Sequence, residues 1–142
     1  MSDHPPEAVK SFNEQVIEEY RANGGVLSGN FAGANLLLLT TTGAKSGKPR
    51  TAPVAYGTDG DRTFVVASKA GADTNPDWFH NLVANPSVTV EQGAETYTAT
   101  AVVADETERP KLFARMVETM PGFADYENMT SRVIPVVLLE RS

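Results

Sequence analysis

Apolar residues recur at helical spacing near the N-terminus and at strand spacing through most of the remaining chain. Residues 6–23 carry one apolar stripe typical of an amphipathic helix, formed by Val9, Phe12, Val16, Ile17 and Tyr20. The Asn-Gly-Gly segment at 23–25 is expected to end this helix, because glycine is common just past a helix end. The residues that follow, up to 34, predict a loop.

Six segments have the short apolar or alternating pattern of β-strands: residues 35–42, 50–57, 62–68, 87–92, 95–104 and 133–140. The Asp-Gly-Asp segment at 59–61 predicts a type I′ hairpin turn, because Asp-Gly tolerates the positive φ angles of that turn. Residues 93–94, Gly-Ala, predict a second hairpin. Pro53 has no amide donor, so we expect an edge or a bulge at that point of its strand.

Two further amphipathic segments predict helices. The first covers residues 76–84, and Asn75 is its expected N-terminal cap. The second begins at Asp105, which forms with Glu108 the D-x-x-E pattern of a capping box. A Pro-Gly pair is expected to end this helix, and residues 120–132 are expected to form a loop.

The predicted elements favour a small antiparallel barrel. They lack the regular strand–helix alternation of a doubly wound parallel sheet. About six antiparallel strands with three flanking helices instead indicate an α+β, mainly β fold. A length of 142 residues suits one core. We therefore expect a single domain over residues 1–142, with the barrel at about 34–140.

Composition argues against several kinds of site. The chain has no cysteine, and His4 and His80 are far apart, so neither a disulfide nor a transition-metal site is expected. A net charge of −6 argues against general nucleic-acid binding, which needs a basic face. The run Leu36–Leu39 is too short to cross a membrane, and the N-terminus lacks a signal-peptide pattern. A cytoplasmic protein is therefore expected.

Positive charge gathers in one region that has no acidic residue. The chain has 18 acidic and 12 basic residues, yet no Asp or Glu occurs from Tyr20 to Thr58. This region contains the turn TTTGAKSGKPRTAPVAY at 40–56, with Lys45 and Arg50. Glycine lets backbone amides approach a ligand closely, and arginine binds phosphate or carboxylate with two hydrogen bonds. The turn indicates either an anion site or a hairpin with solvated lysines, and the residues alone leave both open.

Two other segments are candidate ligand sites. Residues 66–81 combine a lysine, a loop of small residues, a helix N-terminus and Trp78, which suits an anion that carries a flat ring. The alternative is that Trp78 is a core residue. Residues 120–132 place Phe123 and Tyr126 in a loop that can cover a ring-shaped ligand, or that simply closes the end of the barrel.

Four motifs occur in a specific order: T-T-G-x-K-S-G-x-P-R, A-S-K-x-G-A, N-P-x-W and L-x-A-N-P. With these motifs the chain resembles, from about residue 30 to its end, the deazaflavin-dependent nitroreductase family of the flavin/deazaflavin oxidoreductases. The resemblance implies the split β-barrel fold of that family. It also implies coenzyme F420, an 8-hydroxy-5-deazaflavin with a phosphate and an oligoglutamate tail, and makes FMN a less favoured cofactor.

The resemblance assigns the cofactor to three segments. Lys45, Ser46 and Arg50 are expected to hold the phosphate and the tail. Pro53 and residues 66–69 are expected to border the ring and its linker, and residues 77–81 to form the other part of the cleft. The full set of expected cofactor-binding residues is Ala44, Lys45, Ser46, Arg50, Thr51, Pro53, Val66, Ala67, Ser68, Lys69, Asp77, Trp78, Phe79, His80 and Asn81.

The expected activity is reduction of an electron-poor small molecule, namely an enone or lactone, a quinone or a nitro compound, by hydride from reduced F420. Met120, Phe123 and Tyr126 are the expected substrate-binding residues, and Tyr126 is the expected proton donor, with solvent as the alternative source. A carrier for a fatty acid or for another flavin is the alternative function. A monomer or a homodimer is expected.

Overall fold

The computed structural model describes residues 12–27, 35–69 and 74–141. In chain order its elements are α1 (Phe12–Ala22), β1 (Leu36–Thr42), β2 (Pro49–Asp59), β3 (Arg62–Val66), α2 (Asp77–Ala84), β4 (Ser87–Gln92), β5 (Glu95–Val103), α3 (Glu108–Thr119), α4 (Gly122–Asn128) and β6 (Val136–Arg141). Among the described residues, no helix has the length and apolar character needed to cross a membrane.

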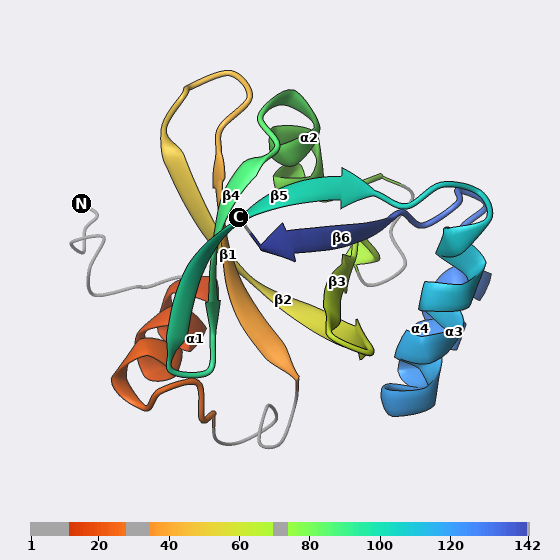
Figure 1. The fold of residues 1–142 in the computed structure, drawn as a ribbon, viewed down its shortest axis with the longest axis horizontal. Coiled ribbons are helices and arrows are strands. Elements are labelled where there is room, and N and C mark those ends of the chain that lie inside the picture. Colours follow the sequence, from red (N-terminus) through yellow and green to blue (C-terminus); the bar gives the residue numbers. More distant parts are fainter. Residues whose placement is uncertain (1–11, 28–34, 70–73, 142) are drawn as a thin grey trace, which may run out of the picture.

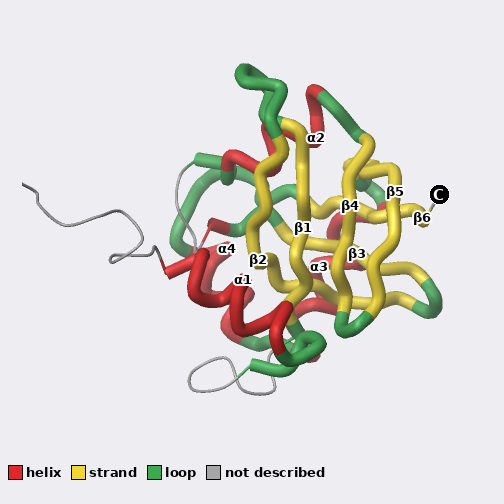
Figure 2. The backbone as a smooth tube through the Cα atoms, turned by 90° about the vertical axis from the view of Figure 1, so that its left-hand side faces the viewer, coloured by secondary structure: helices red, strands yellow, loops and turns green. Residues whose placement is uncertain are grey.

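The six strands form a closed barrel in the order β1-β2-β3-β6-β5-β4 (Figure 1). Every neighbouring pair is antiparallel, and Leu39 of β1 pairs with both Ala52 of β2 and Val90 of β4. Figure 1 shows α1 on one side of the barrel and α3 with α4 on the other, and Figure 2 views the molecule from the α1 side. The predicted barrel of about six antiparallel strands is confirmed.

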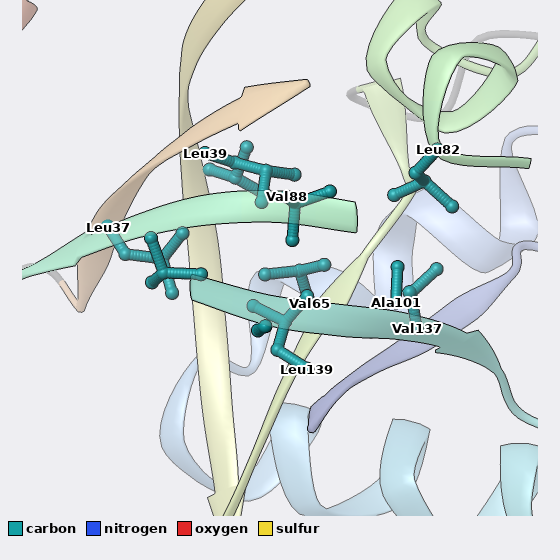
Figure 3. Packing of buried hydrophobic residues seen from close by; sticks show 11 residues of the cluster. Leu37, Leu39, Val65, Leu82, Val88, Ala101, Val137 and Leu139 are labelled. Atoms are coloured by element: carbon teal, nitrogen blue, oxygen red, sulfur yellow. The ribbon is translucent and has the colours of Figure 1, made fainter. Parts of the chain in front are cut away.

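The strand β1 buries both of its faces, which explains its unbroken apolar run. Leu37 and Leu39 face the barrel interior together with Val65, and Leu82 of α2 closes one end of this interior cluster (Figure 3). Leu38, between them in sequence, packs under α1 instead. Each such fully buried side chain contributes roughly 1.5–3 kcal/mol to stability.

A second apolar cluster lies outside the barrel, beneath α3 and α4. Residues of β3 and β6 supply its floor, and the two helices cover it. We call it the outer cluster, and its buried members are Phe64, Val66, Leu112, Phe113, Met116, Phe123, Ile134, Val136 and Leu138.

Tyr20 attaches α1 to the barrel. Its hydroxyl accepts a hydrogen bond from the Gly93 amide at 2.8 Å and lies within donating distance of the carbonyl oxygens of Leu36 (3.0 Å) and Glu91 (3.2 Å). Burial raises the pKa of Tyr20, which keeps the hydroxyl protonated. Arg21 adds a two-pronged pair with the Glu91 carboxylate at 3.0 and 2.8 Å.

The apolar stripe predicted for the first helix is confirmed where the structure describes it. Val16 and Tyr20 are buried, and Ile17 packs beside them. Residues 6–11 and the side chain of Phe12 lie outside the described residues.

Both predicted hairpins occur, but the turn type of the first was wrong. Residues 60 and 61 connect β2 to β3, and only Gly60 has a positive φ, of +65°. A type I′ turn needs positive φ at both positions, whereas glycine at the first position alone is the pattern of type II′. Gly93 has the same arrangement in the β4–β5 hairpin, with φ +64°.

Two side chains that were predicted to cap helices accept hydrogen bonds from arginines instead. The Oδ1 atom of Asn75 accepts a hydrogen bond from Arg132 at 2.7 Å, and α2 has no side-chain cap. Asp105 does accept the Glu108 amide at 2.8 Å, as predicted. In place of the second capping-box contact, from the Glu108 carboxylate back to the Asp105 amide, this carboxylate binds the guanidinium of Arg62 at 3.1 and 2.9 Å.

The segment predicted as a loop at 120–132 contains a helix, α4, so the described chain has four helices where three were expected. Proline is tolerated at a helix start, and Pro121 stands there. Phe123 packs into the outer cluster, and tertiary packing of this kind stabilises a helix too short to form alone. β6 begins later than predicted, after Pro135, whose missing amide cannot join the sheet.

Gly57→Ala should destabilise the barrel. Gly57 of β2 pairs with Phe64 of β3, and an added Cβ would lie 2.5 Å from the Cζ atom of that ring. Because Phe64 is fully buried, we expect a loss of about 1–3 kcal/mol in the free energy of unfolding, measured by urea denaturation. Phe64→Leu should lower the free energy of unfolding by less in the Gly57→Ala background than in the wild type. Equal stability of Gly57→Ala and wild type would contradict this account.

Candidate functional site

A cavity of about 1140 Å³ lies where the turn after β1, the first half of β2 and α2 meet. Its lining residues are Gly43, Ala44, Lys45, Ser46, Arg50, Ala52, Pro53, Lys69, Pro76, Asp77, Trp78, His80 and Asn81. β2 pairs with β1 along residues 49–55 but with β3 only along 56–59. One edge of the first half of β2 is therefore free of the β3 pairing, and Pro53 lies there, as predicted.

The turn at residues 43–48 is closed by its own hydrogen bonds. The Gly43 amide donates to the Lys48 carbonyl at 2.8 Å, and the Gly47 amide donates to the Gly43 carbonyl at 2.9 Å. Gly47 has φ +70°, which favours glycine. A Cβ on Gly43 would lie 2.5 Å from the Ser46 Oγ atom. The backbone therefore favours glycine at position 47, whereas a side chain at position 43 would have to displace the Ser46 hydroxyl.

This turn keeps several donors for a ligand. The amides of Lys45 and Ser46 donate to no acceptor among the described residues. The Ser46 hydroxyl accepts the Lys48 amide at 3.2 Å and retains its own hydrogen for donation. Together with the Lys45 ammonium and the Arg50 guanidinium, these groups suit an anion. The Lys48 side chain does not line the cavity.

Asn81 holds the turn against β1 and α2. Its Oδ1 atom accepts the Ala44 amide at 2.9 Å, and its Nδ2 atom donates to the Thr41 hydroxyl at 3.1 Å. Thr41 is buried in β1. Both ends of the Asn81 amide thus bind protein, so its main effect is to fix the position of the turn.

α2 supplies another wall of the cavity. Asp77 and His80 are exposed on this wall, and Trp78 lies beside them. Trp78 also packs against the interior cluster of the barrel. Trp78 thus packs against the core and also lines the cavity, so its core role leaves the interpretation as a ligand surface open.

Lys69 lines the cavity just after β3, with an unusual backbone. Its φ of +47° lies in the left-handed region, and it is the only non-glycine residue with positive φ in the described part of the chain. Its Nζ atom donates to the Thr74 hydroxyl at 3.2 Å.

The cavity is cationic in an otherwise acidic protein. Lys45, Arg50 and Lys69 line it against one carboxylate, that of Asp77. Such a local excess of positive charge concentrates anions. No group of three or more potential metal ligands occurs among the residues that the structure describes.

The structure brings together most of the residues expected to bind the cofactor. Those that line the cavity are Ala44, Lys45, Ser46, Arg50, Pro53, Lys69, Asp77, Trp78, His80 and Asn81. The others lie behind the lining, buried or partly buried against neighbouring residues: Thr51, Val66, Ala67, Ser68 and Phe79. The expected set omitted Gly43, Ala52 and Pro76. Gly43 and Pro76 belong to the motifs T-T-G and N-P-x-W, which were the signal available for them.

Met120, Phe123 and Tyr126 do not line the cavity. Phe123 is buried in the outer cluster, and Met120 and Tyr126 pack against that cluster. The rings of Phe123 and Tyr126 meet edge to face at 5.1 Å. The structure thus places these three residues in the packing of α4 on α3.

Asn81→Ala should loosen the turn and destabilise the protein. The change removes the acceptor of the Ala44 amide and the donor to the buried Thr41 hydroxyl. We expect a loss of about 1–3 kcal/mol in unfolding free energy and faster hydrogen exchange at the Ala44 amide, measured by NMR. Val83→Ala, on the exposed side of α2, is the matched control. Unchanged exchange at Ala44 would show that Asn81 does not hold the turn.

Comparisons with known proteins agree with this geometry. The family model described as F420H(2)-dependent quinone reductase matches residues 12–141. A protein named F420H(2)-dependent quinone reductase Rv1261c, from Mycobacterium tuberculosis, is 40% identical over 126 residues, which cover 86% of this chain and 85% of that protein.

Two solved structures are also similar. An F420-H2 dependent reductase, FDR-A, has a TM-score of 0.69 at 38% identity and covers 75% of this chain and 94% of its own. A structure described as a domain-swapped dimer has a TM-score of 0.71 at 34% identity, over 89% of this chain and 92% of its own. The family match includes the barrel, the cationic turn and α2, and confirms the expected deazaflavin-dependent relationship. The chain belongs to the F420H(2)-dependent quinone reductase family.

Proposed function

We propose that this protein is an F420H2-dependent reductase that delivers hydride to a quinone, with cofactor and quinone sharing the cavity between the turn, β2 and α2. The observation that carries the proposal is the cationic turn at 43–50 beside Trp78 in one cavity. Family membership supports F420 as the cofactor, and the name of the M. tuberculosis relative supports quinones as acceptors.

The cavity residues fit the chemistry of F420. Its phosphate and oligoglutamate tail need cations and donors, which Lys45, Ser46 and Arg50 provide. Its flat ring needs an apolar surface, which Trp78 and Pro53 provide. The volume of about 1140 Å³ lies just above the range of roughly 300–1,000 Å³ usual for drug-sized ligands, which suits a cofactor as large as F420.

When bound, F420H2 supplies the hydride, and the protein supplies binding and orientation. Reduction of a quinone to a hydroquinone requires one hydride and one proton. Lys45, Arg50 and His80 are exposed where they line the cavity, so water reaches the site and can deliver the proton. Enones, lactones and nitro compounds meet the same requirement for an electron-poor acceptor.

The activity is tested by following oxidation of F420H2 on addition of menadione, a quinone. We expect loss of reduced cofactor that depends on both the enzyme and menadione. No such loss with menadione, or with an enone, a lactone and a nitro compound, would overturn the proposal. Bound acyl chains in the purified protein, without F420 affinity, would favour the fatty-acid carrier, and a yellow protein would favour FMN.

The double variant Lys45→Ala/Arg50→Ala should weaken F420 binding. Both side chains are exposed cations of the cavity lining, so we expect the F420 Kd to rise about 10–100-fold, measured by fluorescence titration. Lys48→Ala is the matched control, because Lys48 belongs to the same turn but not to the lining. Equal Kd values for the double variant and the wild type would place the anionic tail elsewhere.

Tyr126→Phe tests the expected proton donor. Tyr126 packs against the outer cluster and not along the cavity. We therefore expect the kcat for menadione to stay within about twofold of wild type, since general acid catalysis contributes about 100-fold or more where it operates. A fall in kcat larger than tenfold would support Tyr126 as the donor.

The assembly state belongs to the proposal as well. One similar structure is described as a domain-swapped dimer, which favours the homodimer over the monomer for this chain. Light scattering of the purified protein distinguishes the two. The cytoplasmic location expected from the sequence stays a proposal, to be tested by cell fractionation.

A further inference from the structure

Arg132 lies outside the cavity lining but binds the chain on both sides of Lys69. It stands between α4 and β6. Its Nη1 atom donates to the Ala67 carbonyl at 3.1 Å and to the Asn75 Oδ1 atom at 2.7 Å. Its Nη2 atom donates to the Ser68 carbonyl at 2.6 Å. One guanidinium thus joins the end of β3 to the residue that precedes the α2 wall.

We propose that Arg132 is a positioning residue, which holds the Lys69 and Pro76 parts of the cavity wall in the arrangement that binds F420. The proposal rests on the function proposed above, because it assigns the cavity to F420. It adds a residue that has no place in the lining and that the sequence analysis did not single out.

The backbone at Lys69 shows why this wall needs support. A non-glycine residue at φ +47° is strained and persists only where its surroundings fix it. The carbonyls that Arg132 binds belong to the two residues directly before Lys69, and Asn75 directly precedes Pro76. Arg132 therefore binds residues that adjoin both of these lining residues.

The guanidinium group is suited to this task. Its planar fork offers several donors in fixed directions, so it can bridge three acceptors from two segments. A lysine ammonium keeps the charge but is a single point with rotatable donors. Arg132→Lys therefore preserves charge while removing the fixed bridge.

Arg109 provides a matched control within the same part of the fold. It donates to the Ile134 carbonyl at 2.7 Å and pairs with Glu127 at 3.1 Å. Like Arg132, it is a partly buried arginine that binds a backbone carbonyl. Its contacts lie with α4, with the Phe113 ring of α3 and with Ile134, which precedes β6, so Arg109→Lys should affect stability without affecting the cavity.

The first experiment measures F420 affinity by fluorescence titration and steady-state kinetics with menadione. We expect Arg132→Lys to raise the Kd and KM for F420 about tenfold, while kcat at saturating F420 stays within about twofold, because the bridge acts on binding geometry. Arg109→Lys should leave the F420 Kd unchanged, even where it lowers the melting temperature as much as Arg132→Lys does or more. An unchanged Kd in Arg132→Lys, or an equal rise in Arg109→Lys, would overturn the proposal.

A second measurement covers the case in which Arg132→Lys does not fold. Asn75→Ala removes one acceptor of the bridge and leaves Arg132 in place. We expect a rise of about threefold in the F420 Kd of Asn75→Ala, a result that does not need Arg132→Lys to fold. Where Arg132→Lys folds, the Kd of the Asn75→Ala/Arg132→Lys double variant should rise by less than the product of the two single effects. An unchanged Kd in Asn75→Ala, or fully multiplicative effects where both variants fold, would overturn the bridge.

Chemical rescue supplies a readout that general destabilisation would not move. Adding guanidinium to Arg132→Ala should lower the F420 Kd towards the wild-type value, whereas ethylammonium of equal charge should not. Equal effects of the two cations would contradict the proposal. The wild-type titration separates the two levels of inference: absence of F420 binding to the wild type defeats the proposed function, whereas normal wild-type binding with an unaffected Arg132→Lys defeats only this inference.

Discussion

The incomplete pairing of β2 is the constraint on which the site depends. Residues 56–59 of β2 pair with β3 and so close the barrel. Residues 49–55 of β2 pair with β1 but not with β3. Ala52 and Pro53 both line the cavity although neighbouring strand residues face opposite sides, which fits a cavity that meets the strand along its edge. Proline at this place blocks the pairing that would otherwise fill the gap.

The cavity walls attach to buried parts of the barrel. Leu37 and Leu39 inside and Leu38 outside bury β1 on both faces, so the strand is a fixed base for the turn that follows. Side chains then attach each wall to this base. Asn81 joins the turn to buried Thr41, and Arg132 joins the end of β3 to the start of α2. The cavity lining thus comes from a turn, a strand and a helix, and side-chain hydrogen bonds attach these walls to the barrel.

The strands and the cationic turn could be predicted from the sequence because their signals are local. Runs such as Leu36–Leu39 and the spacing of the glycines around Lys45 are readable within a few residues. The predictions that were wrong involve contacts between residues far apart in the sequence. Asn75 looked like a cap but binds Arg132, 57 positions away, and Glu108 binds Arg62, 46 positions away. The helix α4 was missed for a related reason, since packing of Phe123 and not local propensity stabilises it.

The conformation of Lys69 has a consequence for the stability of the whole protein. A left-handed backbone at a residue with a side chain costs about 1–2 kcal/mol, in a fold whose total stability is about 5–15 kcal/mol. Glycine would avoid this cost but would take an ammonium group from the cavity. Stability and cavity charge are therefore opposed at this position. If Lys69 has the proposed role in anion binding, a glycine introduced here for heat resistance would weaken that binding.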